Sequence, residues 1–222
     1  MNSKRLMPFH ISVYLIVFFI FWSVRELVIQ PMFLSPLDSV DSAFIGEVIK
    51  LLTWTLPAVL LIRHFRDDMW IGLKEMFTSK LQWSRDYIFA VVVICLLVAR
   101  PIQAWILHGE LGFGSDFEPA RLIGGVLFVG ITEELVFRGF LLNTFLTRMK
   151  MEYAVALDAV LFVLIHYPIW IYRGFDVSDI AISSIWVAVL SVGFAYSFIK
   201  TRNILVPIVL HMVWNFGIIV FL

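Results

Sequence analysis

The stretch "TEELVFRGF", residues 132–140, interrupts an otherwise apolar run, with "RLIGGVLFVG" (121–130) before it and "LLNTFL" (141–146) after it. Glu133, Glu134 and Arg138 therefore lie where a membrane helix is normally apolar. An ionisable side chain at the bilayer centre costs about 2.5 kcal/mol or more, so such residues usually face a bundle interior or a water-filled cavity. The stretch predicts a membrane-spanning helix whose charges have partners or chemistry inside the protein.

The composition places the whole chain in a membrane. Of its 222 residues, 61% are hydrophobic, and the mean hydropathy is +0.92, too apolar for a soluble domain of this length. The formal net charge is zero and no basic run is long, which argues against a nucleic-acid partner. The N-terminal basic residues and apolar stretch lack a small-residue cleavage site, so we expect a retained first span.

A membrane helix needs about 20 mostly apolar residues, and several segments of the chain meet this requirement. They predict an all-α polytopic bundle, one integral membrane domain over residues 1–222, with about seven transmembrane helices. The expected spans are 9–30, 43–62, 87–107, 121–145, 153–171, 180–199 and 203–222.

Lys and Arg are concentrated in loops that share one side if the seven spans alternate. Cytoplasmic loops carry an excess of these residues, so we expect a cytoplasmic N-terminus. Short loops and the lack of organelle signals favour a bacterial cytoplasmic membrane, with the endoplasmic reticulum as the alternative. The basic residues on the shared side are Lys4, Arg5, Arg63, Arg66, Lys74, Lys80, Arg85, Arg148, Lys150, Lys200 and Arg202, against Arg121 and Arg173 on the other.

Between the second and third spans, "RDDMWIGLKEMFTSKLQWSRD" (66–86) has apolar residues at helical spacing: Trp70, Leu73, Phe77 and Leu81. Such a stripe is typical of an amphipathic helix lying flat on the membrane surface, here on the cytoplasmic side. The alternative is a soluble loop with some apolar residues.

Three further basic residues fall within predicted spans, and each has a polar neighbour close in sequence. We expect structural pairs or snorkelling side chains at these positions: Arg25 with Glu26, Lys50 with Glu47, and Arg100 with Gln103.

The charged side chains of the fourth predicted span point in different directions around the helix axis. At about 100° per residue, Glu134 and Arg138 lie on nearly the same face, whereas Glu133 points about 140° away from Arg138. Glu four residues before Arg is also the favourable order for an ion pair. We therefore expect Glu134 and Arg138 to form a structural pair and Glu133 to be available for chemistry. The alternative is a wholly structural cluster that joins helices.

Two later spans also carry polar residues at mid-membrane depth. "LFVLIHYP" places His166 one turn after Phe162 and just before Pro168, which lacks a backbone donor and should bend the helix beside the imidazole. "VPIVLHMVWNF" places His211 and Asn215 four residues apart on one face. Isolated polar groups at this depth are costly, so we expect them to gather with the carboxylates.

These residue types suit peptide hydrolysis. A glutamate such as Glu133 can activate water, His166 can assist proton transfer, and His211 with Asn215 can present two donors to an oxyanion. Alternatively, Glu133, His166 and His211 could bind zinc, which takes three N or O ligands and an open position. No His-Glu-x-x-His helix supports zinc, so metal-free hydrolysis without a cofactor is the preferred hypothesis.

The chain resembles the CAAX protease and bacteriocin-processing (CPBP/Abi) family of intramembrane endopeptidases, which are similar to type II CAAX prenyl endopeptidases. The resemblance rests on three motifs in this order: Glu-Glu-x-x-x-Arg with "FRG", Phe-x-x-x-His and His-x-x-x-Asn. The motif residues are Glu133, Glu134, Phe137, Arg138, Gly139, Phe162, His166, His211 and Asn215. The resemblance covers a family-like catalytic core at about residues 120–217.

The resemblance implies a helical bundle with a water-accessible cavity. It implies catalytic roles for Glu133, His166, His211 and Asn215, with Glu134, Arg138 and Phe162 in support. The expected partners are the lipid bilayer and a peptide or protein substrate that is embedded in the membrane or associated with it. A lipidated substrate would fit this expectation. The alternatives are a non-catalytic binding or immunity protein of the same fold and an ion- or proton-coupled transporter.

Overall fold

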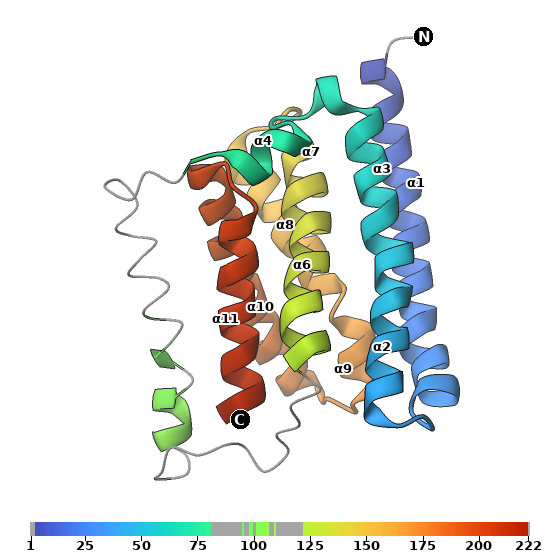
Figure 1. Cartoon of the computed structure of the whole chain (residues 1–222), viewed down its shortest axis with the longest axis vertical. Helices are drawn as coiled ribbons and strands as arrows, with labels where there is room; N and C mark the ends of the chain where they lie inside the picture. The colour runs from blue at the N-terminus through green and yellow to red at the C-terminus, as the bar shows by residue number, and fades with distance from the viewer. Residues whose placement is uncertain are drawn as a thin grey trace.

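The computed structural model describes residues 3–80, 95, 98, 99, 101–106, 109 and 122–221, and within them every regular element is a helix. The helices run roughly side by side along the long axis of the molecule (Figure 1). This confirms the predicted all-α polytopic bundle.

The N-terminal part forms a helical hairpin. The first arm is α1 (Ser3–Val24), continued by the π-helical η1 (Arg25–Leu34). The second arm is α2 (Ser39–Lys50), η2 (Leu51–Thr55) and α3 (Leu56–His64). Asp38 begins the second arm, because its carboxylate accepts hydrogen bonds from the backbone N–H groups of Val40 and Asp41. The bond from Asp41 is the main cause that lowers the pKa of this carboxyl below its usual value.

The C-terminal part contains four helical runs, and three of them carry the predicted site residues. The first is one helical run of four pieces, η4 (Leu122–Phe128), α6 (Val129–Glu134), η5 (Leu135–Leu142) and α7 (Asn143–Phe145). Next come α8 (Met151–Leu164) and α9 (Tyr167–Tyr172), then α10 (Val177–Thr201) and α11 (Leu205–Phe221).

Four helical runs in the described residues are long and apolar enough to cross a membrane: Met7–Leu34, Val40–His64, Met151–Tyr172 and Val177–Thr201. The apolar Leu205–Phe221 is shorter, and the run from Leu122 to Phe145 carries the charges of the opening motif. Of the predicted span 87–107, the structure describes only residues 95, 98, 99 and 101–106. Outward-facing side chains such as Phe44 (69% exposed) are apolar, as expected for a surface that contacts lipid.

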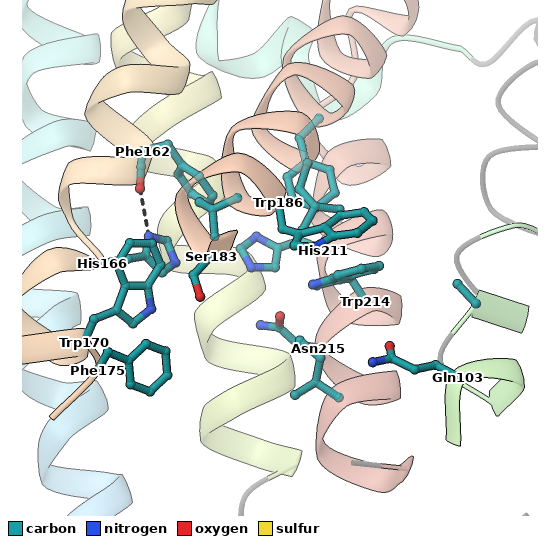
Figure 2. A pocket seen from close by; sticks show the side chains of 15 residues that line it. Gln103, Phe162, His166, Trp170, Phe175, Ser183, Trp186, His211, Trp214 and Asn215 are labelled. Atoms are coloured by element: carbon teal, nitrogen blue, oxygen red, sulfur yellow. Dashed lines mark hydrogen bonds between the residues drawn. The ribbon is translucent and has the colours of Figure 1, made fainter. Parts of the chain in front are cut away.

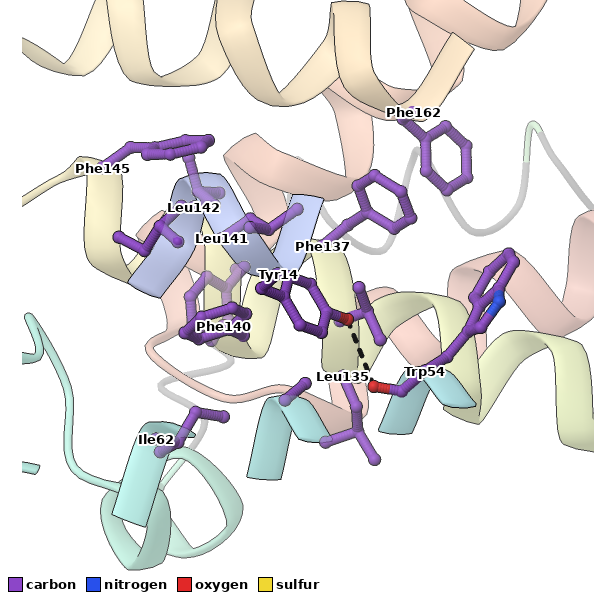
Figure 3. Packing of buried hydrophobic residues seen from close by; sticks show 14 of the residues in the cluster. Tyr14, Trp54, Ile62, Leu135, Phe137, Phe140, Leu141, Leu142, Phe145 and Phe162 are labelled. Atoms are coloured by element: carbon purple, nitrogen blue, oxygen red, sulfur yellow. Dashed lines mark hydrogen bonds between the residues drawn. The ribbon is translucent and has the colours of Figure 1, made fainter. Parts of the chain in front are cut away.

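Aromatic residues form much of the core where the N-terminal hairpin meets the η5 segment (Figure 3). Phe18 packs with its ring centroid 4.6 Å from that of Trp54, and Phe140 meets Tyr14 edge to face at 5.1 Å. The Tyr14 hydroxyl donates to the Trp54 backbone carbonyl over 3.2 Å. The core therefore ties the hairpin directly to the helix that carries the charged motif.

One end of the bundle holds the start of α1, the end of α3, α4 (Leu73–Thr78), and the α7–α8 and α10–α11 turns (Figure 1). The basic loops predicted to share a side thus lie together where they are described. Arg202 in the last of these turns pairs with Glu75 of α4 at 2.8 Å.

The predicted amphipathic helix over 66–86 is shorter in the structure. Trp70 precedes α4, because Gly72 is extended at the helix N-cap, and Leu81 lies outside the described residues. The fully buried side chain of α4 is Met76 rather than Phe77, which is 40% exposed. Met76 is buried because its backbone carbonyl accepts from Ile204, which holds α4 against the start of α11.

The buried Asn143 side chain joins α7 to the loop that precedes α4, at the same end of the bundle. Its amide oxygen accepts from the Ile71 backbone N–H at 2.8 Å, and its amide nitrogen donates to the Ile71 carbonyl at 2.9 Å. Both residues are buried. The side chain therefore satisfies both backbone groups of one loop residue away from water.

Asn143→Leu should lower the free energy of unfolding by about 2 kcal/mol or more, because two buried backbone groups lose their partners. Asn143→Asp keeps the acceptor but buries a carboxylate beside the Ile71 and Gly139 carbonyl oxygens, so it should lose at least as much. Unfolding in mixed-detergent titrations measures this order. A leucine variant as stable as the parent would show that the Ile71 contact contributes nothing.

Candidate functional site

The charged motif lies on a helix that is buried on all sides at this depth. Glu133 is 6% exposed, and Glu134 and Arg138 are not exposed at all. Gly130, one turn earlier, lets α11 approach closely: a Cβ there would lie 2.8 Å from Met212 Cγ. Small residues permit such close contacts between membrane helices. The close contact at Gly130 brings His211 of α11 beside the two glutamates.

Arg138 is the centre of a buried polar network. Its guanidinium contacts Glu134 at 3.1 Å and Asp158 of α8 at 3.5 Å. It also donates to the hydroxyl and backbone carbonyl of Ser191 in α10, at 2.8 and 2.9 Å. The Glu134–Arg138 pair expected from their spacing is present, but the guanidinium also joins two further helices.

Asp158 and Ser191 were not predicted as members of the site. Asp158 carries a usable signal, since a carboxylate within the predicted span 153–171 is as costly as those of the opening motif. Ser191 carries none, because serine is common in membrane helices and usually bonds to its own helix.

His211 connects the network to Glu133. Its Nδ1 donates to Glu134 Oε1 at 2.8 Å, and its Nε2 lies 4.0 Å from Glu133 Oε2. The imidazole stacks on Phe194 with ring centroids 5.0 Å apart, which fixes its plane. Glu133 Oε2 is buried and, like oxygens of Glu134 and Asp158, has no hydrogen-bond partner within the described part of the chain. Glu134 and Asp158 are paired with Arg138, whereas Glu133 is not, so Glu133 is the carboxylate left available.

His166 lies at a break between α8 and α9, as Pro168 predicts. Ile165 ends α8 and His166 is the N-cap of α9. The His166 Nδ1 lies 2.8 Å from the Phe162 backbone carbonyl. A carbonyl only accepts, so Nδ1 carries the proton, and in neutral imidazole Nε2 is then the acceptor.

Phe162 contacts three of the other predicted site residues. Its ring meets the His166 and His211 rings edge to face, with centroids 5.2 and 6.0 Å apart, and the Arg138 guanidinium lies 4.5 Å from its centroid. The phenyl ring thus separates the buried cation from the imidazoles and sets their spacing.

Both histidines and Asn215 line one cavity of about 680 Å³ (Figure 2). Its walls are mainly aromatic, and Trp186 on its edge is 59% exposed, so the cavity opens to the surroundings. The lining residues are Ala99, Gln103, Phe162, His166, Trp170, Phe175, Ser183, Trp186, Val187, Leu190, Phe194, His211, Trp214, Asn215 and Ile218.

Asn215 is already engaged on one side. Its amide nitrogen donates to the Gly125 backbone carbonyl at 2.9 Å. An amide nitrogen carries two hydrogens, so a second donor remains. The structure therefore places His211 and Asn215 on the same wall, with one Asn215 hydrogen used to hold α11 against η4.

The zinc alternative needs Glu133, His166 and His211 to converge on one point. Among the described residues, which include all three, no group of three or more His, Cys, Asp or Glu side chains is arranged to hold a metal ion. In this arrangement the three side chains do not converge on one point.

The charged residues of the N-terminal hairpin form a second cluster, as the spacing predicts. Arg25 pairs with Glu26, and Lys50 lies 3.6 Å from Glu47. Arg100 lies outside the described residues. The two pairs are structural, and Glu133 remains separate from them in its hydrogen bonding.

Residues 116–217 match the model of the family described as Type II CAAX prenyl endopeptidase Rce1-like. The match contains Glu133, Glu134, Arg138, Phe162, His166, His211 and Asn215. No curated protein and no solved structure matches the chain. The resemblance expected from the three motifs is confirmed.

Arg138→Ala should destabilise the protein by about 3–5 kcal/mol, because it leaves the Glu134 and Asp158 carboxylates buried without their cation. Glu134→Ala should also destabilise, and the double variant should lose less than the sum of the two. Unfolding free energies in mixed detergent provide the test, with Glu152→Ala on the exposed start of α8 as control. Strict additivity would contradict the pairing.

Proposed function

We propose that the chain, whose residues 116–217 belong to the Type II CAAX prenyl endopeptidase Rce1-like family, is an intramembrane endopeptidase with Glu133 as its general base. The family membership supports a CAAX-type endopeptidase. The observation that supports the assignment of the base is that Glu133, unlike Glu134 and Asp158, is not paired with Arg138, and its Oε2 faces His211 Nε2 at 4.0 Å.

In this proposal one water binds between these two atoms, which requires a small movement of side chains because Glu133 Oε2 is buried. A distance of 4.0 Å is too long for a direct hydrogen bond but allows one water oxygen to bond to both atoms. Glu133 would take a proton from this water as its oxygen attacks the peptide carbonyl carbon. The carbonyl π electrons move to the oxygen and form a tetrahedral oxyanion.

His211 and Asn215 would stabilise that oxyanion. Glu134 accepts the His211 Nδ1 proton and so fixes the direction of the imidazole. If Nε2 also carries a proton, His211 and the second hydrogen of the Asn215 amide can donate to the new negative charge. When the C–N bond breaks, the leaving nitrogen takes the proton gained by Glu133, directly or through His166 Nε2.

The cavity supports a membrane-associated peptide or protein as substrate. Its volume of about 680 Å³ is sufficient for several side chains. Trp170, Trp186 and Trp214 provide broad apolar faces with one polar edge each, which suits a segment at the membrane interface and would also accept a lipidated one. No metal or cofactor takes part in this scheme.

The end of the bundle that carries Arg148, Lys150, Lys200 and Arg202 would face the cytoplasm, since basic loops are retained there. We place the protein in a bacterial cytoplasmic membrane, with the endoplasmic reticulum as the alternative location.

Glu133→Gln should abolish proteolysis, because the amide cannot take a proton from water while its shape is nearly the same. Peptide termini in membranes from cells with the parent protein, with Glu133→Gln and with Glu152→Gln should be compared by mass spectrometry. Glu152 is exposed at the start of α8, so its variant should retain every new terminus.

Termini that depend on Glu133 would establish proteolysis and identify substrates together. If the three membranes gave identical termini at equal protein levels, even when offered a panel of lipidated and unmodified membrane peptides, the endopeptidase proposal would be wrong. Ion flux in liposomes would then test the transporter alternative.

Cleavage by the purified protein should persist after treatment with a strong chelator, because the proposed base and donors are all protein groups. Elemental analysis should find less than one zinc per chain. Loss of cleavage on chelation, restored by zinc, would replace the metal-free mechanism. A chelator-treated zinc endopeptidase provides the positive control.

A further inference from the structure

Trp22 of α1 makes a long-range hydrogen bond to the backbone of the site. Its indole N–H donates to the Ile165 carbonyl at 2.7 Å, although the two residues are 143 positions apart. Trp22 is 6% exposed and lies outside the segment that matches the family. A buried bond of this length is a strong local constraint in a low-dielectric interior.

The acceptor belongs to the peptide unit that directly precedes His166. The Ile165 carbonyl and the His166 N–H are parts of one planar group. The carbonyl accepts from Trp22, and the N–H donates to the Val163 carbonyl at 3.0 Å. Both ends of this plane are therefore held, which fixes the direction in which the His166 side chain leaves the backbone.

This restraint is placed at a weak point of the span. Pro168 interrupts the regular helical hydrogen bonds between α8 and α9, and a helix without those bonds bends readily. The hydrogen bond from Trp22 of α1 therefore restrains this turn, where the helix lacks its own hydrogen bonds.

The indole is itself held firmly. Its ring meets that of Trp54 edge to face, with centroids 4.4 Å apart. The Arg25 guanidinium and the Lys50 ammonium lie 5.1 and 5.4 Å from the Trp22 ring, within the range of cation–π attraction. Arg25 and Lys50 of the N-terminal hairpin thus help to hold the Trp22 indole, which donates to the Ile165 carbonyl.

We propose that Trp22 is a positioning residue for His166, acting through the Ile165 carbonyl. The proposal rests on the proposed role of His166 in proton transfer. It assigns to the N-terminal hairpin a part in the reaction that the family-matched segment cannot perform alone.

Trp22→Phe keeps an aromatic ring and removes the donor. Trp54→Phe is the matched control, because Trp54 is equally buried, contacts Trp22 and Lys50, and its indole N–H has no hydrogen-bond partner in the described residues. A small displacement of a catalytic group can cost up to about 100-fold in rate. We expect Trp22→Phe to lower kcat about tenfold with little change in KM, and Trp54→Phe to keep kcat within about twofold.

A second readout does not depend on proteolysis. Diethyl pyrocarbonate modifies accessible imidazoles, and mass spectrometry gives its rate at each histidine. We expect His166 to react severalfold faster in Trp22→Phe than in Trp54→Phe, while His211, bonded to Glu134, keeps its rate in both. This result without any detectable protease activity would support the positioning role and contradict the proposed function separately.

Equal effects of the two phenylalanine variants on kcat and on His166 reactivity would overturn the proposal and leave Trp22 as a packing residue. If Trp22→Phe does not fold, 3-benzothienylalanine at position 22 replaces only the indole N–H with sulfur. The same two measurements on that protein, against the same residue at position 54, then decide between the outcomes.

Discussion

The burial of the Arg138 guanidinium determines how four helical segments pack. A fully buried cation is expensive unless its charge and its donors are satisfied. The charge of Arg138 is compensated by Glu134 on its own helix and by Asp158 on α8, and the guanidinium donates to Ser191 on α10, although its Nε has no hydrogen-bond partner in the described residues. Glu134 in turn accepts from His211 on α11. Moving any of these helices away would expose an unpaired charge to an apolar interior, so the network fixes their relative positions.

The same network explains why one glutamate of the pair remains available. The three guanidinium nitrogens of Arg138 point to Glu134, Asp158 and Ser191. Glu133 lies on a different face of the helix and meets the far side of the His211 imidazole instead. The cation therefore holds Glu134 in a structural role, and His211 transmits that order to the wall of the cavity without neutralising Glu133.

Local spacing predicts the parts of this arrangement that are local. The Glu134–Arg138 pair and the break at His166 follow from four-residue spacing and from Pro168, and both are present. The partners across helices depend on how the spans rotate against each other, which periodicity alone does not determine. Asp158 could have been noticed by its charge, but its partner could not have been identified.

The pattern of apolar residues does not show how the segment 66–86 is anchored to the bundle. Phe77 of the predicted stripe is exposed, as expected for a residue that contacts lipid, whereas Met76 is the buried residue of α4. The reason is tertiary: Ile204 bonds to the Met76 carbonyl, and Asn143 holds both backbone groups of Ile71. None of these bonds is visible in the spacing of the segment's own residues.

The contact between Trp22 and Ile165 belongs to the same class and shows why motifs describe only part of a site. A hydrogen bond to a backbone carbonyl requires no particular side chain at the acceptor, so Ile165 shows no sign of it in the sequence. Trp22 reads as one more aromatic residue in an apolar span. Helix α1, which lies outside the matched segment, nevertheless forms a hydrogen bond to the peptide plane that precedes His166. A motif records residue types at a fixed spacing, whereas the peptide plane that precedes His166 is held here by a helix that the motif does not include.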